Sequence, residues 1–100
     1  MQPNMKMLQQ MQNRMAKIQE ELGEQIVSAD AGGGMVTVEV TGLQELRSIK
    51  IKPEAIDPDD PETLEDLLVV AVNSAMDQSR KLAEQKMGAL TAGMKIPGLF

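Results

Sequence analysis

The stretch MVTVEVTGLQELRSIKIKP, residues 35–53, decides the fold. Apolar and other side chains alternate in residues 35–41 and again in residues 46–52, and a period of two is typical of a half-buried β-strand. Gly42 begins a turn between the two segments, and Pro53, which has no N–H to donate to a neighbouring strand, ends the second. The stretch therefore predicts two antiparallel strands, each with one apolar face. The apolar positions are Val36, Val38, Val40, Ile49 and Ile51.

A weaker strand is predicted ahead of this pair, at residues 25–30, and three glycines join it to the pair. Helices are predicted on both sides of the strands. Residues 4–23 carry apolar side chains at spacings of three and four, which places them on one stripe of a helix. A second helix is predicted from Pro61 to about Met87, because Asp60 is a favourable N-cap residue and proline is favourable at the first helical position.

These elements predict a single α+β domain over residues 1–100, in the order α-β-β-β-α, with a three-stranded antiparallel sheet between two long helices. Residues 91–100 are expected to form a loose tail. Strands of this length span ~20 Å, whereas the helices would be ~30 and ~40 Å long. Both helices must therefore overhang the sheet, in a direction that the sequence leaves open. If they pair antiparallel, their basic ends meet.

The composition favours a homodimer. In these 100 residues Phe100 is the only aromatic, and there are nine methionines. A short chain buries a modest share of its surface, small cores commonly rely on aromatic side chains, and methionine specifies a core weakly. We therefore expect a second subunit to share the core formed by the five apolar strand positions. The Met-rich stripe of the first helix belongs either to such a core or to an adaptable surface for a protein partner.

Charge is segregated along the chain, although its total is −5. Eight acids in residues 53–79 face no Lys or Arg, whereas the two helix ends and the third predicted strand are basic. A single basic side chain is most often merely solvated, but a cluster of them on two helices is a candidate phosphate-binding surface. No helix-turn-helix pattern and no aromatics for base stacking are present. The candidate positions are Lys6, Arg14, Lys17, Arg80, Lys81 and Lys86, with Lys50 and Lys52 as the alternative site.

An enzyme is not expected, because the chain has no His or Cys and no serine has an evident activating partner. The acidic run from Asp57 to Glu62 superficially suggests a cation site, but it lacks the glycine and the terminal glutamate of a calcium loop. An acidic loop that caps the following helix explains the run better, so neither a metal nor a cofactor is predicted. Residues 1–15 have no apolar signal-peptide core, and no run approaches the ~20 residues of a transmembrane span.

Five ordered segments carry a resemblance that covers nearly the whole chain. They are residues 11–22, GGGMVTVEVTG (32–42), IKIKPEAID (49–57), LEDLLVVAVNSAM (64–76) and MGALTAGMKIPG (87–98). The series resembles the YbaB/EbfC family of small bacterial nucleoid-associated proteins. This resemblance implies a tweezers-like homodimer that binds double-stranded DNA with low sequence preference, in the cytoplasm at the nucleoid, through the six basic helix positions. The rival hypothesis is a dimeric interaction module whose Met-rich helices clasp a protein partner.

Overall fold

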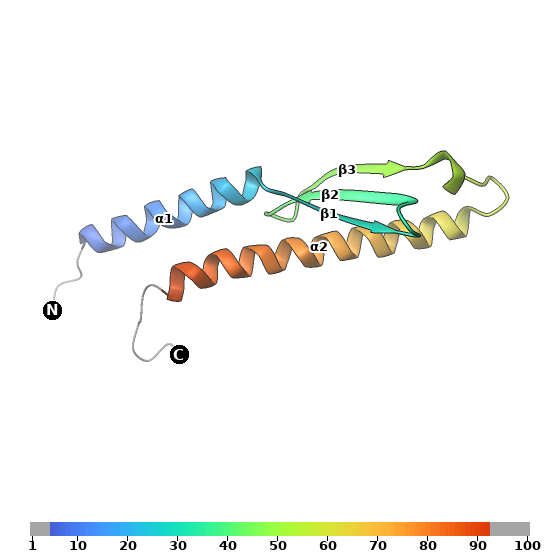
Figure 1. Ribbon diagram of the computed structural model, residues 1–100. Coiled ribbons are helices and arrows are strands. Elements are labelled where there is room, and N and C mark those ends of the chain that lie inside the picture. Colours follow the sequence, from blue (N-terminus) through green and yellow to red (C-terminus); the bar gives the residue numbers. More distant parts are fainter. Residues whose placement is uncertain (1–4, 93–100) are drawn as a thin grey trace.

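The computed structural model describes residues 5–92 and confirms the predicted order of elements (Figure 1). The strands and the first helix begin and end within one residue of the predicted boundaries. No helix in the described range is both long and apolar enough to cross a membrane. The elements are α1 (Met5–Glu24), β1 (Ile26–Ala31), β2 (Val36–Thr41), β3 (Leu46–Ile51), the short 3-10 helix η1 (Pro53–Ala55) and α2 (Pro61–Ala92).

The helix α2 begins as predicted and ends later than predicted. Asp60 Oδ1 accepts a hydrogen bond from the Thr63 N–H at 3.4 Å, so the aspartate caps the first turn. The helix then runs to Ala92, past the predicted end near Met87. Gly88 does not stop it, because a glycine inside a helix costs only about 1 kcal/mol relative to alanine. The rest of the predicted tail, residues 93–100, lies outside the described residues.

The three strands form one antiparallel sheet in the order β1-β2-β3, so β2 is central. The long helix α2 lies against β1 and β2 (Figure 1). The side chains of Val36, Val38 and Val40 are fully buried beneath it, together with Ala71 and Ala75 of the helix. The alanines are small, which lets the helix approach the valines closely.

The packing of α2 against the sheet removes one of the reasons for expecting a core shared between two subunits. We expected the strand valines to need cover from a second subunit, but α2 of the same chain covers them completely. Their cross-strand neighbours on β3 are different. Ile49 pairs with Val38 and therefore lies on the same face of the sheet, yet it is 40% exposed, because α2 does not extend across β3.

The end of α1 is fixed to the turn between β2 and β3. Leu22 is buried, and its carbonyl oxygen accepts a hydrogen bond from the Gly42 N–H at 2.8 Å. A Cβ atom at position 42 would lie 2.7 Å from that oxygen, so only glycine allows this approach. The contact sets where α1 leaves the sheet.

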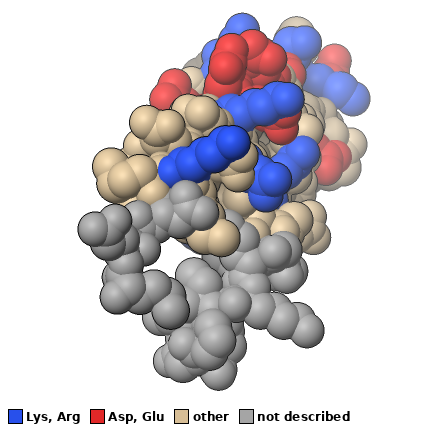
Figure 2. All heavy atoms as spheres, turned by 90° about the vertical axis from the view of Figure 1, so that its left-hand side faces the viewer, with Lys and Arg blue, Asp and Glu red and all other residues tan. Residues whose placement is uncertain are grey.

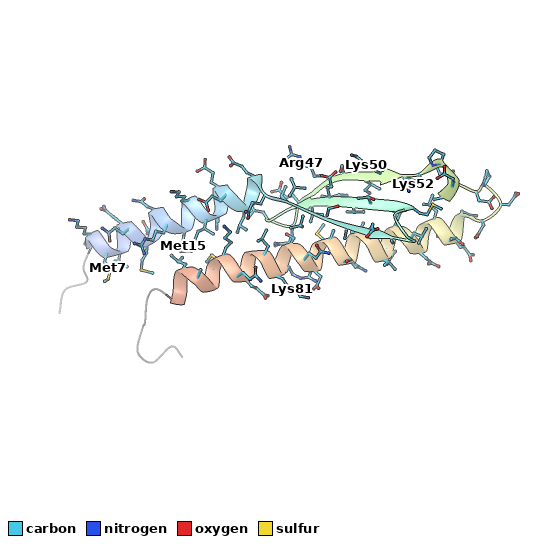
Figure 3. All side chains as sticks on the ribbon, viewed as in Figure 1. Met7, Met15, Arg47, Lys50, Lys52 and Lys81 are labelled. Carbon is cyan, nitrogen blue, oxygen red and sulfur yellow. The ribbon has the colours of Figure 1, made fainter. Side chains whose placement is uncertain are left out.

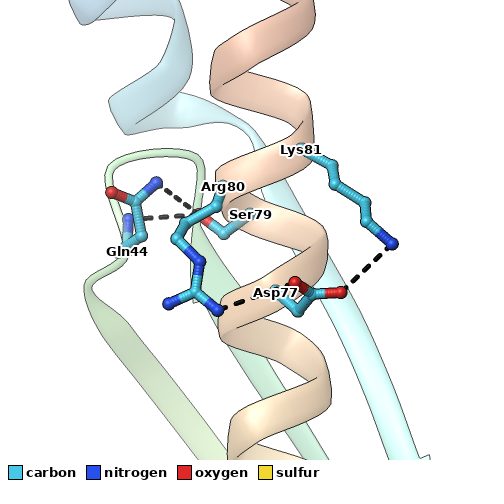
Figure 4. A network of polar contacts seen from close by, with 5 residues as sticks. All are labelled: Gln44, Asp77, Ser79, Arg80 and Lys81. Carbon is cyan, nitrogen blue, oxygen red and sulfur yellow. Dashed lines mark hydrogen bonds and ion pairs between the residues drawn. The ribbon is translucent and has the colours of Figure 1, made fainter.

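The same turn is fixed to the middle of α2 by Ser79, which is fully buried. Its hydroxyl donates to the Thr41 carbonyl at 2.6 Å. It accepts hydrogen bonds from Gln44 N and Gln44 Nε2 at 3.2 and 3.0 Å (Figure 4). Gln44 has a φ of 61°, a left-handed conformation that is rare outside glycine, and the two bonds from this residue to the serine support it. Both helices are thus held at the same turn.

The direction of the overhang follows from these two attachments. Beyond the turn, α1 and the second half of α2 run antiparallel, contact each other and project away from the sheet (Figure 1). The molecule is consequently elongated, with its longest axis at 70 Å. We refer below to the projecting helix pair, residues 5–21 and 80–92, as the helical arm.

Candidate nucleic-acid interface

Three of the predicted DNA-binding residues lie together on α1. Lys6, Arg14 and Lys17 are exposed, and at about 100° per residue their positions fall within an arc of roughly 80° around the helix. Within residues 5–92 no ion pair joins any of the three to an acid. Their charges are therefore available to an external anion such as a phosphate.

Arg80 and Lys81 of α2 are exposed but are occupied by an acid of the same helix. Asp77 contacts Arg80 Nη2 at 3.6 Å through Oδ1 and Lys81 Nζ at 3.1 Å through Oδ2 (Figure 4). The hydrogen bond and charge of Lys81, and then the charge of Arg80, hold the pKa of the Asp77 carboxyl below its ordinary value of 3.8. A phosphate must compete with this carboxylate. Consecutive residues are also about 100° apart around the helix, so the two cations point to different sides.

Lys86 occupies a different position from the other two basic residues of α2. It is half-buried. It follows Ser79 by nearly two full turns, so both residues lie on the same face of α2. Near Ser79 this face contacts the sheet, and further along the helix it faces α1. Measured from the turn that holds Leu22 and Ser79, Lys86 and Arg14 are both about 11–12 Å along the arm at 1.5 Å per residue. The structure thus brings Lys86 level with Arg14, and places Arg80 and Lys81 at the base of the arm.

An end-on view shows the result. Figure 2 shows several Lys and Arg side chains on the described surface seen from the end of the molecule that carries the arm, with Asp and Glu side chains above and beside them. The acids between the basic positions were visible in the sequence. Asp77 precedes Arg80 and Lys81 by three and four residues, the spacing at which helical side chains form ion pairs, and this signal could have lowered the ranking of the two cations in advance.

The alternative basic site, Lys50 and Lys52, lies on β3 and on the residue that follows it, where Lys52 is exposed. Arg47 and Lys50 project from this strand on the side away from α2 (Figure 3). Lys50 Nζ lies 4.0 Å from Glu39 Oε1, the same oxygen that accepts a hydrogen bond from Ser48 Oγ at 2.9 Å. A carboxylate therefore lies close to Lys50 at the centre of this strand, whereas no acid of the described residues pairs with the three cations of α1. The helical arm is consequently the better candidate for phosphate.

The far end of the long axis is acidic. It consists of η1, the loop after it and the first two turns of α2 (Figure 1). In the described part of the chain, no three acids converge in a way that could hold a metal ion. The acidic residues of this end are Glu54, Asp57, Asp59, Asp60, Glu62, Glu65 and Asp66.

A second surface, which the sequence analysis did not identify, is apolar. Leu46 and Ile49 of β3 are 49% and 40% exposed on the face beside α2. Val69 of α2 is 59% exposed and lines a groove of about 270 Å³ with Leu68, Val72 and Asn73. Val69 precedes Arg80 by about three full turns, so the two residues lie on the same face of α2. Figure 4 shows Arg80 on the side of α2 nearest the β2–β3 turn. The groove therefore opens on the β3 side of the helix. We call Leu46, Ile49, Leu68, Val69 and Val72 the β3–α2 surface.

Comparisons with known proteins agree with this architecture. The profile of the YbaB/EbfC DNA-binding family matches residues 1–94. A nucleoid-associated protein of Desulforamulus reducens is 56% identical over 96 residues, which cover 96% of this chain and 91% of that protein. A nucleoid-associated protein of Chloroflexus aurantiacus is 53% identical, with coverages of 96% and 94%.

A solved structure also has a similar fold. The crystal structure of an uncharacterized protein from Helicobacter pylori is similar with a TM-score of 0.64 and 27% identity, covering 89% of this chain and 99% of that one. Taken with the family profile, these matches define a small α+β protein of a bacterial DNA-binding class. The chain belongs to the YbaB/EbfC DNA-binding family.

Proposed function

We propose that this chain binds double-stranded DNA as a homodimer at the nucleoid of the bacterial cytoplasm, chiefly through phosphate contacts and with little sequence preference. The observation that carries the proposal is the set of Lys6, Arg14 and Lys17, which are exposed on one flank of α1 and form no ion pair with an acid of residues 5–92. Lys86 of α2 lies level with Arg14 along the arm. The arm offers cations but no element shaped to read base edges, which is the basis for expecting low specificity.

Binding should be weak and strongly dependent on salt. The chain carries −5, so a dimer carries twice that, and its acidic parts repel the duplex. If four to six phosphates were contacted, a plot of log K against log salt would have a slope of about −4 to −5. A mobility-shift assay on several unrelated duplexes across a salt series measures both the slope and the specificity.

Two charge-matched double variants test the location of the site. Arg14→Glu with Lys17→Glu should abolish the shift, because it reverses two unpaired cations of the arm. The control is Arg47→Glu with Lys50→Glu, which makes the same change in net charge on β3 and should weaken binding far less. Equal losses in both would show that only net charge matters, and loss in the control alone would place the site on β3.

We place the dimer contact on the β3–α2 surface. It supplies exposed apolar side chains on the face of the sheet that α2 leaves open, and a groove beside them. A stable contact needs more than about 1,600 Å² of total buried area, so the neighbouring part of α2 must take part as well. Ile51, which is half-buried, lies on the same face of β3 and would join it.

Val69 and Val70 give a matched test of this contact. Both are valines of α2, at 59% and 57% exposure, but only Val69 lines the groove. Val69→Asp should dissociate the dimer in sedimentation at micromolar concentration, because it buries an unpaired charge, whereas Val70→Asp should not. A wild-type monomer, or identical behaviour of the two variants, would refute this assignment.

The protein-partner hypothesis rests on the exposed methionines at the tip of α1, of which Met5 is 65% exposed. It becomes the better proposal if the wild type shifts no duplex even at about 50 mM salt, where phosphate contacts are strongest.

A further inference from the structure

The outer part of α1 combines cations with neutral amides. Residues 5–19 contain three cations and five Asn or Gln side chains, and the first acid of the helix is Glu20. All five amide side chains are exposed. A side-chain amide carries no net charge, but it can donate two hydrogen bonds through its NH2 group and accept others through its oxygen.

Two of the amides lie among the cations. At about 100° per residue, the three cations and two of the amides fall within one arc of about 100° around α1. We call these residues the outer α1 face, and they are Lys6, Gln10, Asn13, Arg14 and Lys17. No other residue of 5–19 falls within the arc, so the face holds neither an acid nor an apolar side chain. Met15, which Figure 3 shows on the side of α1 toward the line of α2, lies about 150° from the centre of the arc. The face is therefore turned away from α2.

The two amides occupy the interval between the cations. Along the axis of α1, at 1.5 Å per residue, Lys6 and Arg14 are about 12 Å apart. Gln10 and Asn13 lie between them, about 6 and 10.5 Å beyond Lys6. Within residues 5–92 neither of these side-chain amides forms a hydrogen bond. Both can therefore bond to a ligand that spans the cations.

Acidic residues limit the face on the side of the sheet. Toward the base of the arm, the positions in the same arc are occupied by Glu21 and Glu24. Carboxylates repel phosphates, so a duplex on this face must lie along its outer part, which measures about 17 Å from Lys6 to Lys17. Over this length the face offers three cations and two amides, and no other donor side chain.

We propose that Gln10 and Asn13 donate hydrogen bonds to the sugar–phosphate backbone of the duplex between the cations, and so act as positioning residues for DNA binding. This inference rests on the proposed function. Contacts of Asn and Gln with the backbone fix a protein on the duplex without reading its sequence. A cation that meets a phosphate releases a counterion and loses affinity as salt rises, whereas a neutral amide releases none. The two amides therefore supply a part of the affinity that does not depend on salt.

Alanine substitutions at matched positions test this contact. Gln10→Ala with Asn13→Ala keeps the net charge and puts a residue that favours helix at both positions. The control is Gln12→Ala with Gln19→Ala, because these exposed amides lie about 150–170° from the centre of the outer α1 face. Arg14→Ala removes a cation from the face itself. Fluorescence anisotropy measures the affinity of each protein for an A·T-rich and a G·C-rich duplex between about 50 and 200 mM salt.

The three variants should differ in both affinity and salt dependence. Gln10→Ala with Asn13→Ala should bind both duplexes roughly tenfold more weakly at every salt concentration, as expected for the loss of two neutral hydrogen bonds. The slope of log K against log salt should stay as in the wild type. Arg14→Ala should instead reduce the magnitude of the slope by about 1, and the control should bind as the wild type does.

Three results would overturn the inference while DNA binding itself stands. One is that the Gln10 and Asn13 double variant binds as tightly as the control. Another is that its slope falls as in Arg14→Ala, which would mean that the substitutions act through the cations. The third is a loss confined to one duplex, which would mean that the amides read base edges. A wild type that binds neither duplex at about 50 mM salt would refute the proposed function, and the inference with it.

Discussion

Replacing Gly42 by alanine should detach α1 from the sheet. A Cβ atom there would lie 2.7 Å from the Leu22 carbonyl oxygen, 3.1 Å from its Cα and 2.9 Å from its Cδ2. The leucine side chain can rotate, but the first two of these atoms belong to the backbone and cannot move without shifting the last turn of α1. Such a shift also lengthens the 2.8 Å hydrogen bond from Gly42 N to Leu22 O.

The cost combines overpacking, about 1–3 kcal/mol, with the weakened hydrogen bond, about 1 kcal/mol. For a chain of this size each kcal/mol shifts the melting temperature by about 4–8 °C, so Gly42→Ala should lower it by roughly 8 °C or more. Thermal unfolding followed by far-UV circular dichroism measures this change.

Gly88→Ala is the matched control. Apart from its chain neighbours and the backbone of its own helix, no heavy atom of the described residues lies within 4 Å of the Cβ it would add. The position is inside α2, where alanine is favoured over glycine by about 1 kcal/mol. The same substitution should therefore raise the melting temperature by several degrees. If Gly42→Ala were as stable as the wild type, or if both variants shifted the melting temperature in the same direction, the account of the α1 junction would be wrong.

Three further variants test other contacts. Ser79→Ala leaves the polar groups of the β2–β3 turn without their buried partner and should cost about 1–3 kcal/mol in urea unfolding, with Ser74→Ala on the same helix as a comparison. Asp60→Ala removes the N-cap of α2 and should cost about 0.5–2 kcal/mol without reducing DNA affinity. Asp77→Asn releases two cations, so DNA binding in a mobility shift should become tighter. Because the pKa of Asp77 is lowered on folding, its stabilising contribution is present above pH 3.8 and is lost as the pH falls below that value, and the asparagine variant should lack this part of the acid dependence.

Local patterns in the sequence predicted the elements well, because each has a local physical cause. The alternating valines of β2 and the Asp60-Pro61 pair at the start of α2 needed no knowledge of distant contacts. The end of α2 was placed too early at Gly88. A single glycine is a weak stop signal when the residues on both sides of it favour helix.

The arrangement of these elements was harder to predict. Alternation showed that Val38 would be buried, but not that α2 of the same chain would bury it, because a periodic pattern identifies the apolar face and not what covers it. The direction of the overhang depends on the Leu22–Gly42 and Ser79–Thr41 contacts, whose partners are far apart in the sequence. The β3–α2 surface also went unnoticed, since it exists only where α2 fails to cross β3.

The separation of the acidic end from the basic arm gives this elongated molecule a dipole moment along its 70 Å axis. In the field of a polyanion such a rod experiences a torque as well as an attraction or repulsion, and the torque turns the arm inward whatever the sign of the net charge. Molecules aligned in this way along a duplex would have their acidic ends pointing away from the DNA. Repulsion between the acidic ends of neighbouring molecules would keep them apart and limit how densely they coat the DNA. Rising ionic strength screens this repulsion and would allow denser coating.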